Sequence, residues 1–124
     1  MKKNMSGSII NFSSINSRFG FSNNPGYVSS KGAVSALTRS LAKDYGKHNI
    51  RVNAISPGYI KTDMTRKSWS NMKLSNQRLD RNVIKRWGEK KDIVGAIILL
   101  CSKSSSFITG SEITIDGGFS INGI

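Results

Sequence analysis

Three short apolar runs rich in β-branched residues alternate with helical segments, and this alternation restricts the possible folds of the chain most strongly. The runs occupy residues 7–13, 50–55 and 113–118, each of strand length. The first lacks strict apolar–polar alternation, which favours a strand buried on both faces, as in a parallel sheet. Strands joined by helices in this order predict an α/β fold with right-handed crossovers.

The longer of the two predicted helices covers residues 27–45. Val34, Leu37 and Leu41 recur there at steps of three and four residues, which is typical of a helix with one apolar face. Gly46 follows directly, and glycine commonly ends a helix at this position.

The second predicted helix covers residues 89–101 and also has one apolar face. The residues of this face are Ile93, Ala96, Ile97 and Leu100. The run ends at Cys101, the only cysteine of the chain, so a disulfide framework is excluded. Its apolar neighbours favour a buried, inert thiol over a reactive one.

Two segments lack clear periodicity. Residues 14–26 are rich in Ser, Asn and Gly and predict a loop. Residues 59–87 are polar and weakly periodic, so we expect a mobile segment with one or two helical turns. Long segments of this kind inside compact domains usually act as lids or linkers.

The 124 residues fit a single domain, and their net charge of +12 raises the question of nucleic acid binding. The basic residues are spread along the chain, without zinc-finger spacing, a helix-turn-helix pattern or an RNP-like motif. We therefore favour a basic surface and keep a nucleic-acid-binding protein as an alternative. No apolar run approaches the ~18 residues of a membrane span, so we expect a soluble, cytoplasmic protein.

Tyr27 and Lys31 are four residues apart and share one face of the first helix. A phenol is a poor base at neutral pH because it keeps its proton up to roughly pH 10, but a cation beside it favours the phenolate. Taken alone, the pair also fits a solvated surface contact. Ser14, however, follows the first strand, and strand ends of an open parallel sheet are where ligands bind.

The second strand brings further residues to the same edge of the sheet. It is stopped by Pro57 and Gly58. Asn53, within this strand, fits either a bond to nearby backbone or a role in ligand binding. The single histidine, His48, has no cysteine or acidic cluster beside it, so no metal site is predicted.

Together these motifs resemble the short-chain dehydrogenase/reductase family, and are most like its 3-oxoacyl-carrier-protein reductases and sugar or polyol dehydrogenases. The resemblance extends over residues 7–118 in the family's order and spacing. It rests on I-I-N-F-S-S at 9–14, Y-V-S-S-K at 27–31, R-V-N-A-I-S-P-G at 51–58, T-D-M at 62–64, R-W-G at 86–88, I-T-G at 108–110 and D-G-G at 116–118.

The resemblance implies a fold and a set of roles. The fold is the C-terminal half of a Rossmann-like doubly wound parallel sheet, with about three parallel strands and flanking helices. Ser14 orients the substrate oxygen, Tyr27 is the general acid or base, and Lys31 favours the phenolate and binds the nicotinamide ribose. The nicotinamide pocket is lined by Pro57, Gly58, Ile60 and Thr62.

The family's glycine-rich T-G-x-x-x-G-x-G turn, which holds the cofactor pyrophosphate, does not occur in the sequence. The resemblance thus makes residues 1–124 a partial domain: the catalytic half, with residues 63–86 as a substrate-binding lid and the dinucleotide-binding half absent. The residue that selects NAD or NADP belongs to that half, so either cofactor fits. A truncated gene, an internal start codon, a domain fragment and a half that works with a partner chain all fit the sequence.

The resemblance predicts an NAD(P)-dependent oxidoreductase that transfers a hydride between nicotinamide and a small-molecule carbonyl or secondary alcohol. The missing motif leaves open whether this chain alone is an enzyme. The first alternative is an inert fragment that acts only in association, through the helix at residues 27–45. The expected protein partner is a second copy or the missing half. Cations in the lid suggest an anionic substrate, among them Arg66, Lys73, Arg78, Arg81, Lys85 and Arg86.

Overall fold

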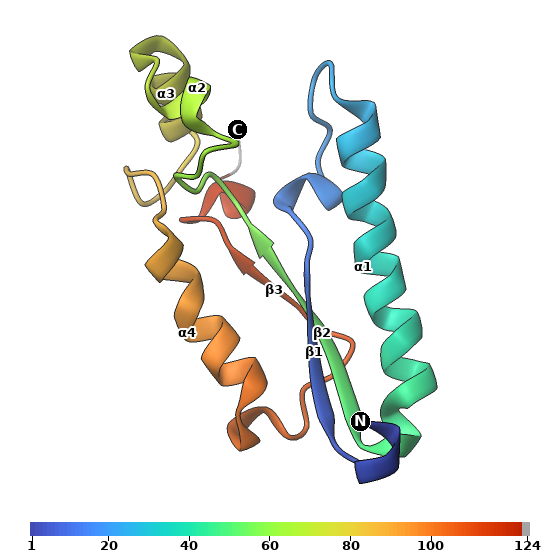
Figure 1. Ribbon diagram of the computed structural model, residues 1–124. Coiled ribbons are helices and arrows are strands. Elements are labelled where there is room, and N and C mark those ends of the chain that lie inside the picture. Colours follow the sequence, from blue (N-terminus) through green and yellow to red (C-terminus); the bar gives the residue numbers. More distant parts are fainter. Residues whose placement is uncertain (123–124) are drawn as a thin grey trace.

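The computed structural model describes residues 1–122, which form a three-stranded parallel sheet between two helices (Figure 1). The strands are β1 (Gly7–Phe12), β2 (Ile50–Pro57) and β3 (Glu112–Ile115), hydrogen-bonded in the order β1-β2-β3. The helices are α1 (Pro25–Tyr45), α2 (Arg66–Trp69), α3 (Met72–Leu79) and α4 (Lys90–Cys101). The predicted α/β class and parallel sheet are confirmed. No helix in this part of the chain has the length and apolar character needed to cross a membrane.

Side-chain alternation along β1 places α1 and α4 on opposite faces of the sheet (Figure 1). The Asn11 amide donates to Thr38 Oγ1 on α1 at 3.0 Å, whereas Ser8 Oγ donates to the Leu100 carbonyl on α4 at 2.8 Å. Residues 8 and 11 are three apart and therefore point to opposite faces of a strand. Both crossovers, from β1 to β2 and from β2 to β3, lead to the next strand in the same direction along the sheet. Because their helices lie on opposite faces of the sheet, one crossover is right-handed and the other is left-handed. The expectation of right-handed crossovers throughout is thus wrong for one of them. The long connection from β2 to β3 lets α4 reach the other face.

The sheet is buried at its centre and open at its first edge. β1 runs parallel to β2 with Gly7 opposite Ile50, and β2 runs parallel to β3 with Ala54 opposite Glu112. The core lies along β2, where almost every side chain is buried. β1 is only half-buried, and Phe12 is 51% exposed, because no strand within residues 1–122 pairs with its outer edge. The expectation that β1 is buried on both faces is therefore wrong for this chain.

Helix α1 packs on the sheet through small and polar residues. Its buried side chains are Ser35, Thr38 and Ala42, while Leu37 is 51% exposed. The side-chain periodicity predicted the helix correctly, and Val34 and Leu41 are half-buried, but the centre of the buried face lies on the polar residues that hydrogen-bond to the sheet side. Pro25 occupies the first turn, where its missing N–H costs nothing.

The end of α1 differs from the prediction. Gly46 keeps right-handed backbone angles and begins a 3₁₀ turn, Gly46–His48. The chain reverses at Asn49, which has a φ of 53°. Asparagine tolerates the left-handed conformation better than most residues, so the reversal does not need the glycine.

Helix α4 begins in a capping box formed by Glu89 and Asp92. Its predicted apolar face is confirmed, since Leu100 is fully buried and the other three residues of that face are half-buried. Cys101, however, is exposed, so the expectation of a buried thiol is wrong. One residue corresponds to about 100° of helical rotation, which turns Cys101 away from the face that carries Leu100.

Candidate active site

The predicted site residues converge at the carboxyl end of the sheet. Ser14 lies just after β1, Tyr27 and Lys31 are on the first turns of α1, and the turn that follows β2 supplies the others. One open cavity of about 590 Å³ is lined by Ser14, Tyr27, Lys31, Pro57, Gly58, Ile60 and Thr62. The structure thus brings all seven residues together, although they come from three separate segments of the chain.

Lys31 is fixed beside the phenol ring of Tyr27. Its Nζ donates to the carbonyl of Phe12, the last residue of β1, at 2.9 Å. The same Nζ lies 5.7 Å from the centre of the Tyr27 ring, within the range of a cation–π interaction. The end of β1 therefore holds the ammonium group where it faces both Tyr27 and the cavity.

The hydroxyl of Ser14 is available in a way that the hydroxyl of Ser13 is not. Ser14 Oγ accepts from the Asn16 N–H at 3.2 Å and caps a short 3₁₀ turn, so its own hydrogen can still be donated. Ser13 Oγ lies 2.8 Å from Ser35 Oγ and 3.3 Å from the Lys31 carbonyl. Ser13 therefore belongs to the contact between β1 and α1, and this arrangement favours Ser14 as the group that meets a substrate.

Glu112, at the start of β3, supports this site, and the sequence analysis did not identify it. Its Oε1 accepts from Ser17 Oγ at 3.3 Å and its Oε2 lies 3.7 Å from the Arg18 guanidinium, so it holds the turn that follows Ser14. Burial raises the pKa of Glu112, but nearby hydroxyls and the charge of Arg18 outweigh it and hold that pKa below its usual value. These hydroxyls belong to Ser35, Ser13 and Ser56. The available signal in the sequence was an acidic residue at the start of an otherwise apolar strand.

Asn53 has a structural role. It is fully buried, its Nδ2 donates to the Ile108 carbonyl at 2.8 Å, and its Oδ1 accepts from the Ser111 N–H at 3.0 Å. Of the two interpretations of Asn53, the structure therefore favours backbone bonding. The two hydrogen bonds fix the segment that leads into β3.

Close backbone contacts shape the turn after β2. A Cβ on Gly58 would lie 2.7 Å from the Cβ of Asp116 and 2.8 Å from its Cα, so only glycine fits there. Two backbone hydrogen bonds join the next residues to Gly88: Lys61 N–H to the Gly88 carbonyl and Gly88 N–H to the Tyr59 carbonyl, both 2.9 Å. The turn that follows β2 is thus held close to the start of α4.

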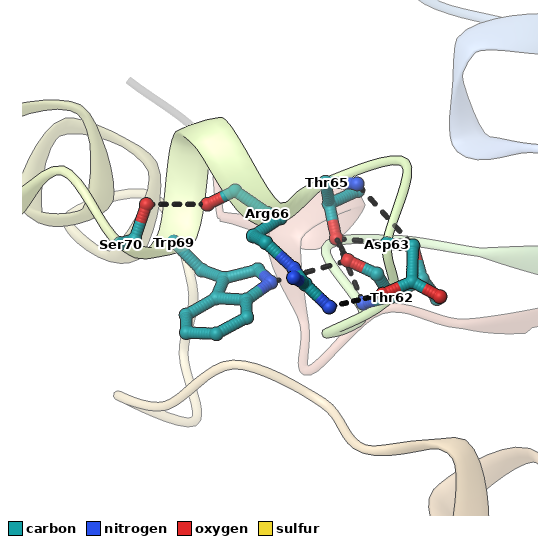
Figure 2. A network of polar contacts seen from close by, with 6 residues as sticks. All are labelled: Thr62, Asp63, Thr65, Arg66, Trp69 and Ser70. Carbon is teal, nitrogen blue, oxygen red and sulfur yellow. Dashed lines mark hydrogen bonds and ion pairs between the residues drawn. The ribbon is translucent and has the colours of Figure 1, made fainter.

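Thr62 lies in a compact polar network that begins the segment of residues 63–86 (Figure 2). Its N–H donates to Thr65 Oγ1 at 2.9 Å, and Thr65 Oγ1 donates to the Ile60 carbonyl at 2.7 Å. Trp69 Nε1 donates to the Thr62 carbonyl at 3.2 Å, which ties α2 to the same turn. The segment contains two short helices, α2 and α3, which make about three helical turns where one or two were predicted.

A second cavity, of about 380 Å³, adjoins the first. Both are lined by Ser14, Tyr27, Gly58, Met64 and Thr65, so the serine and the tyrosine border both cavities. The larger cavity extends from there toward α4 and the smaller one toward α3. This geometry suits a reaction between two bound molecules that meet at Ser14 and Tyr27.

Comparison with known proteins agrees with this arrangement. A family model described as enoyl-(acyl carrier protein) reductase matches residues 1–120. L-xylulose reductase of Caenorhabditis elegans is 41% identical over 120 residues, which cover 97% of this chain and 48% of that protein. The chain spans about half the length of the curated relatives it matches.

Solved structures of other proteins also match this chain over nearly its whole length. A gluconate 5-dehydrogenase from Burkholderia cenocepacia, in complex with NADP and tartrate, has a TM-score of 0.94 and 31% identity over 97% of this chain and 47% of its own. A short-chain type dehydrogenase/reductase from Mycobacterium ulcerans has a TM-score of 0.94 and 31% identity over 98% of this chain and 44% of its own.

Proposed function

This chain belongs to the short-chain dehydrogenase/reductase family, and we propose that it binds the nicotinamide end of NAD or NADP and moves the proton during hydride transfer to or from a small molecule. The observation that carries this proposal is the meeting of Ser14, Tyr27 and Lys31 in one cavity with the turn after β2. A positioned hydroxyl, a proton donor and a fixed cation are the groups that reduction of a carbonyl requires.

The larger cavity fits the nicotinamide and its ribose. Ile60, Ile93 and Ile97 give it an apolar wall for a flat ring, and the Lys31 ammonium is available to the ribose hydroxyls. When bound, the nicotinamide supplies or accepts the hydride. The described residues contain no glycine-rich turn for the pyrophosphate, so this fit concerns the nicotinamide end and applies equally to NAD and NADP.

The chain's own groups account for the proton. Ser14 would donate a hydrogen bond to the carbonyl oxygen of the substrate. Tyr27 would give that oxygen its proton during reduction and take it back during oxidation. Lys31, fixed by the Phe12 carbonyl, would stabilise the phenolate that remains. One hydride on carbon and one proton on oxygen complete the conversion of a ketone to an alcohol.

The smaller cavity suits a substrate with several hydroxyl groups. Its lining includes the polar side chains of Asn16, Asn24 and Ser68, beside Ser14 and Tyr27. The names of the relatives support the same class, since they include L-xylulose reductase and gluconate 5-dehydrogenase. The segment of residues 63–86 would cover this substrate, because Met64, Thr65 and Arg78 also line the cavity.

Oxidation of NADH or NADPH by polyhydroxylated ketones tests the proposal. Tyr27→Phe removes the proton donor and leaves the ring, so we expect turnover to fall by about 100-fold or more. Tyr45→Phe, at the far end of α1, is the matched control and should leave turnover unchanged. Equal turnover of the Tyr27→Phe variant and the original chain would refute the proposed role.

A second candidate function, association with a second copy, rests on exposed apolar residues. Leu37 on α1 and Ile98 on α4 are 51% and 63% exposed, and the outer edge of β1 has no partner among residues 1–122. Unpaired edges and apolar patches promote association. Sedimentation should show a dimer or larger species that Leu37→Glu dissociates. A monomer at every concentration would exclude this function.

A further inference from the structure

Arg78, on α3, faces the cavity in which the proposed function places the substrate. It lines the cavity of about 380 Å³ together with Ser14 and Tyr27. From this position we infer that the substrate carries an oxyanion, either a carboxylate or a phosphate, and that Arg78 binds it. The inference rests on the proposed function only in taking Ser14 and Tyr27 as the groups that meet the substrate's reacting oxygen.

Three other cations of the segment are engaged elsewhere. Arg66 pairs with Asp63, and Arg86 pairs with Asp92 through contacts of 2.7 and 3.0 Å. Lys85 Nζ donates to backbone carbonyls at the end of α3. The Arg78 side chain has neither an ion pair nor a hydrogen bond with any of residues 1–122.

Aromatic rings hold the Arg78 guanidinium in place without using its donors. Its central carbon lies 4.9 Å from the centre of the Tyr59 ring and 5.8 Å from the centre of the Phe21 ring. The side chain is half-buried. Contact with ring faces restricts its rotamers, yet all five N–H groups stay available for a ligand. Arginine in this state is suited to bind the two oxygens of a carboxylate or phosphate at once.

The charge of the cavity points in the same direction. Its lining contains two cations, Arg78 and Lys67, and no aspartate or glutamate. Asn16 and Asn24 add neutral hydrogen-bonding groups beside Ser14. An anion entering this space would meet attraction without repulsion from a carboxylate, whereas a neutral polyol would form hydrogen bonds without the attraction between opposite charges.

Equilibrium binding of three ligands that share a six-carbon hydroxylated chain tests the inference. D-gluconate carries a carboxylate, D-sorbitol 6-phosphate carries a phosphate, and D-sorbitol is neutral. We expect calorimetry to give at least one charged ligand an affinity roughly 10- to 100-fold above that of sorbitol, since a charged hydrogen-bonded pair contributes that much. The tighter of the two charged ligands identifies the oxyanion.

Arg78→Gln should lower the affinity of the charged ligand to that of sorbitol and leave the affinity for sorbitol unchanged. A merely structural role of Arg78 would weaken all three ligands together. Arg81→Gln is the matched control, because Arg81 lies in the turn just after α3, stacks on Phe119 at 4.9 Å and does not line this cavity. Equal affinities of the unchanged protein for all three ligands, or an equal loss in both variants, would overturn the inference.

This experiment is independent of hydride transfer. If neutral and charged ketones are reduced equally well by NADPH and Tyr27→Phe abolishes both reactions, the inference fails and the proposed function stands. If charged ligands bind through Arg78 but no ketone is reduced, the proposed function fails and the inference stands.

Discussion

Replacement of Asn53 by alanine tests the structural role of the one fully buried amide in β2. The change removes hydrogen bonds of 2.8 Å to the Ile108 carbonyl and 3.0 Å from the Ser111 N–H. Each such bond contributes about 1 kcal/mol net, and the void left by the side chain costs about 1 kcal/mol more. We therefore expect the free energy of unfolding to fall by about 3 kcal/mol, and the melting temperature by roughly 10 °C.

Urea denaturation followed by circular dichroism measures this loss, with Asn11→Ala as the matched control. Asn11 lies on the neighbouring strand, is half-buried and makes a single side-chain bond, to Thr38 at 3.0 Å, so its removal should cost only about 1 kcal/mol. Equal losses in the two variants would refute the argument. Weaker cofactor binding by Asn53→Ala at unchanged stability would instead assign Asn53 to the ligand.

Two further predictions concern glycines and one ion pair. Gly58→Ala should lower the free energy of unfolding by more than about 1 kcal/mol, because its Cβ would lie 2.7 Å from the Cβ of Asp116. Gly95→Ala, with open space around it, should raise the free energy of unfolding by about 0.5–1 kcal/mol. Thermal unfolding that changed in the same direction for both variants would contradict this expectation. Hydrogen bonds from Arg86 lower the pKa of Asp92 to about 2, so the stability that this pair adds is present above roughly pH 4, the ordinary pKa, and is lost as the pH falls toward 2. Asp92→Asn should remove that dependence, and an unchanged acid unfolding profile of this variant would contradict the assignment.

The sequence determined the elements and the site more fully than the way in which they pack. All three strands were located from short apolar runs. Ser14, Tyr27 and Lys31, which the sequence assigned to one candidate site, line one cavity, because one strand end and one helix face impose their spacing. Parallel strands bring their carboxyl ends to one edge, so residues far apart in the chain could be assigned to one cavity.

The missed features depend on contacts that sequence periodicity does not record. The periodicity of α1 indicated a helix, but hydrogen bonds of Thr38 to Asn11 on β1 and of Ser35 to Ser13 just after it decided which face meets the sheet. The hand of the second crossover depends on where a long connection takes α4. Glu112 supports the turn after Ser14 from across the sheet, a relation that exists only after β1, β2 and β3 have aligned.

The most direct test of this account is the binding of NADH and NADPH to the purified chain, measured by fluorescence, for the original sequence, Lys31→Ala and Lys43→Ala. Lys31 lines the proposed nicotinamide cavity, whereas Lys43 is exposed near the far end of the same helix. We expect the chain to bind at least one of the cofactors, Lys31→Ala to weaken this binding, and Lys43→Ala to leave it unchanged. Folded protein that binds neither cofactor, or binding that is insensitive to Lys31→Ala, would contradict the assignment of this cavity to the nicotinamide.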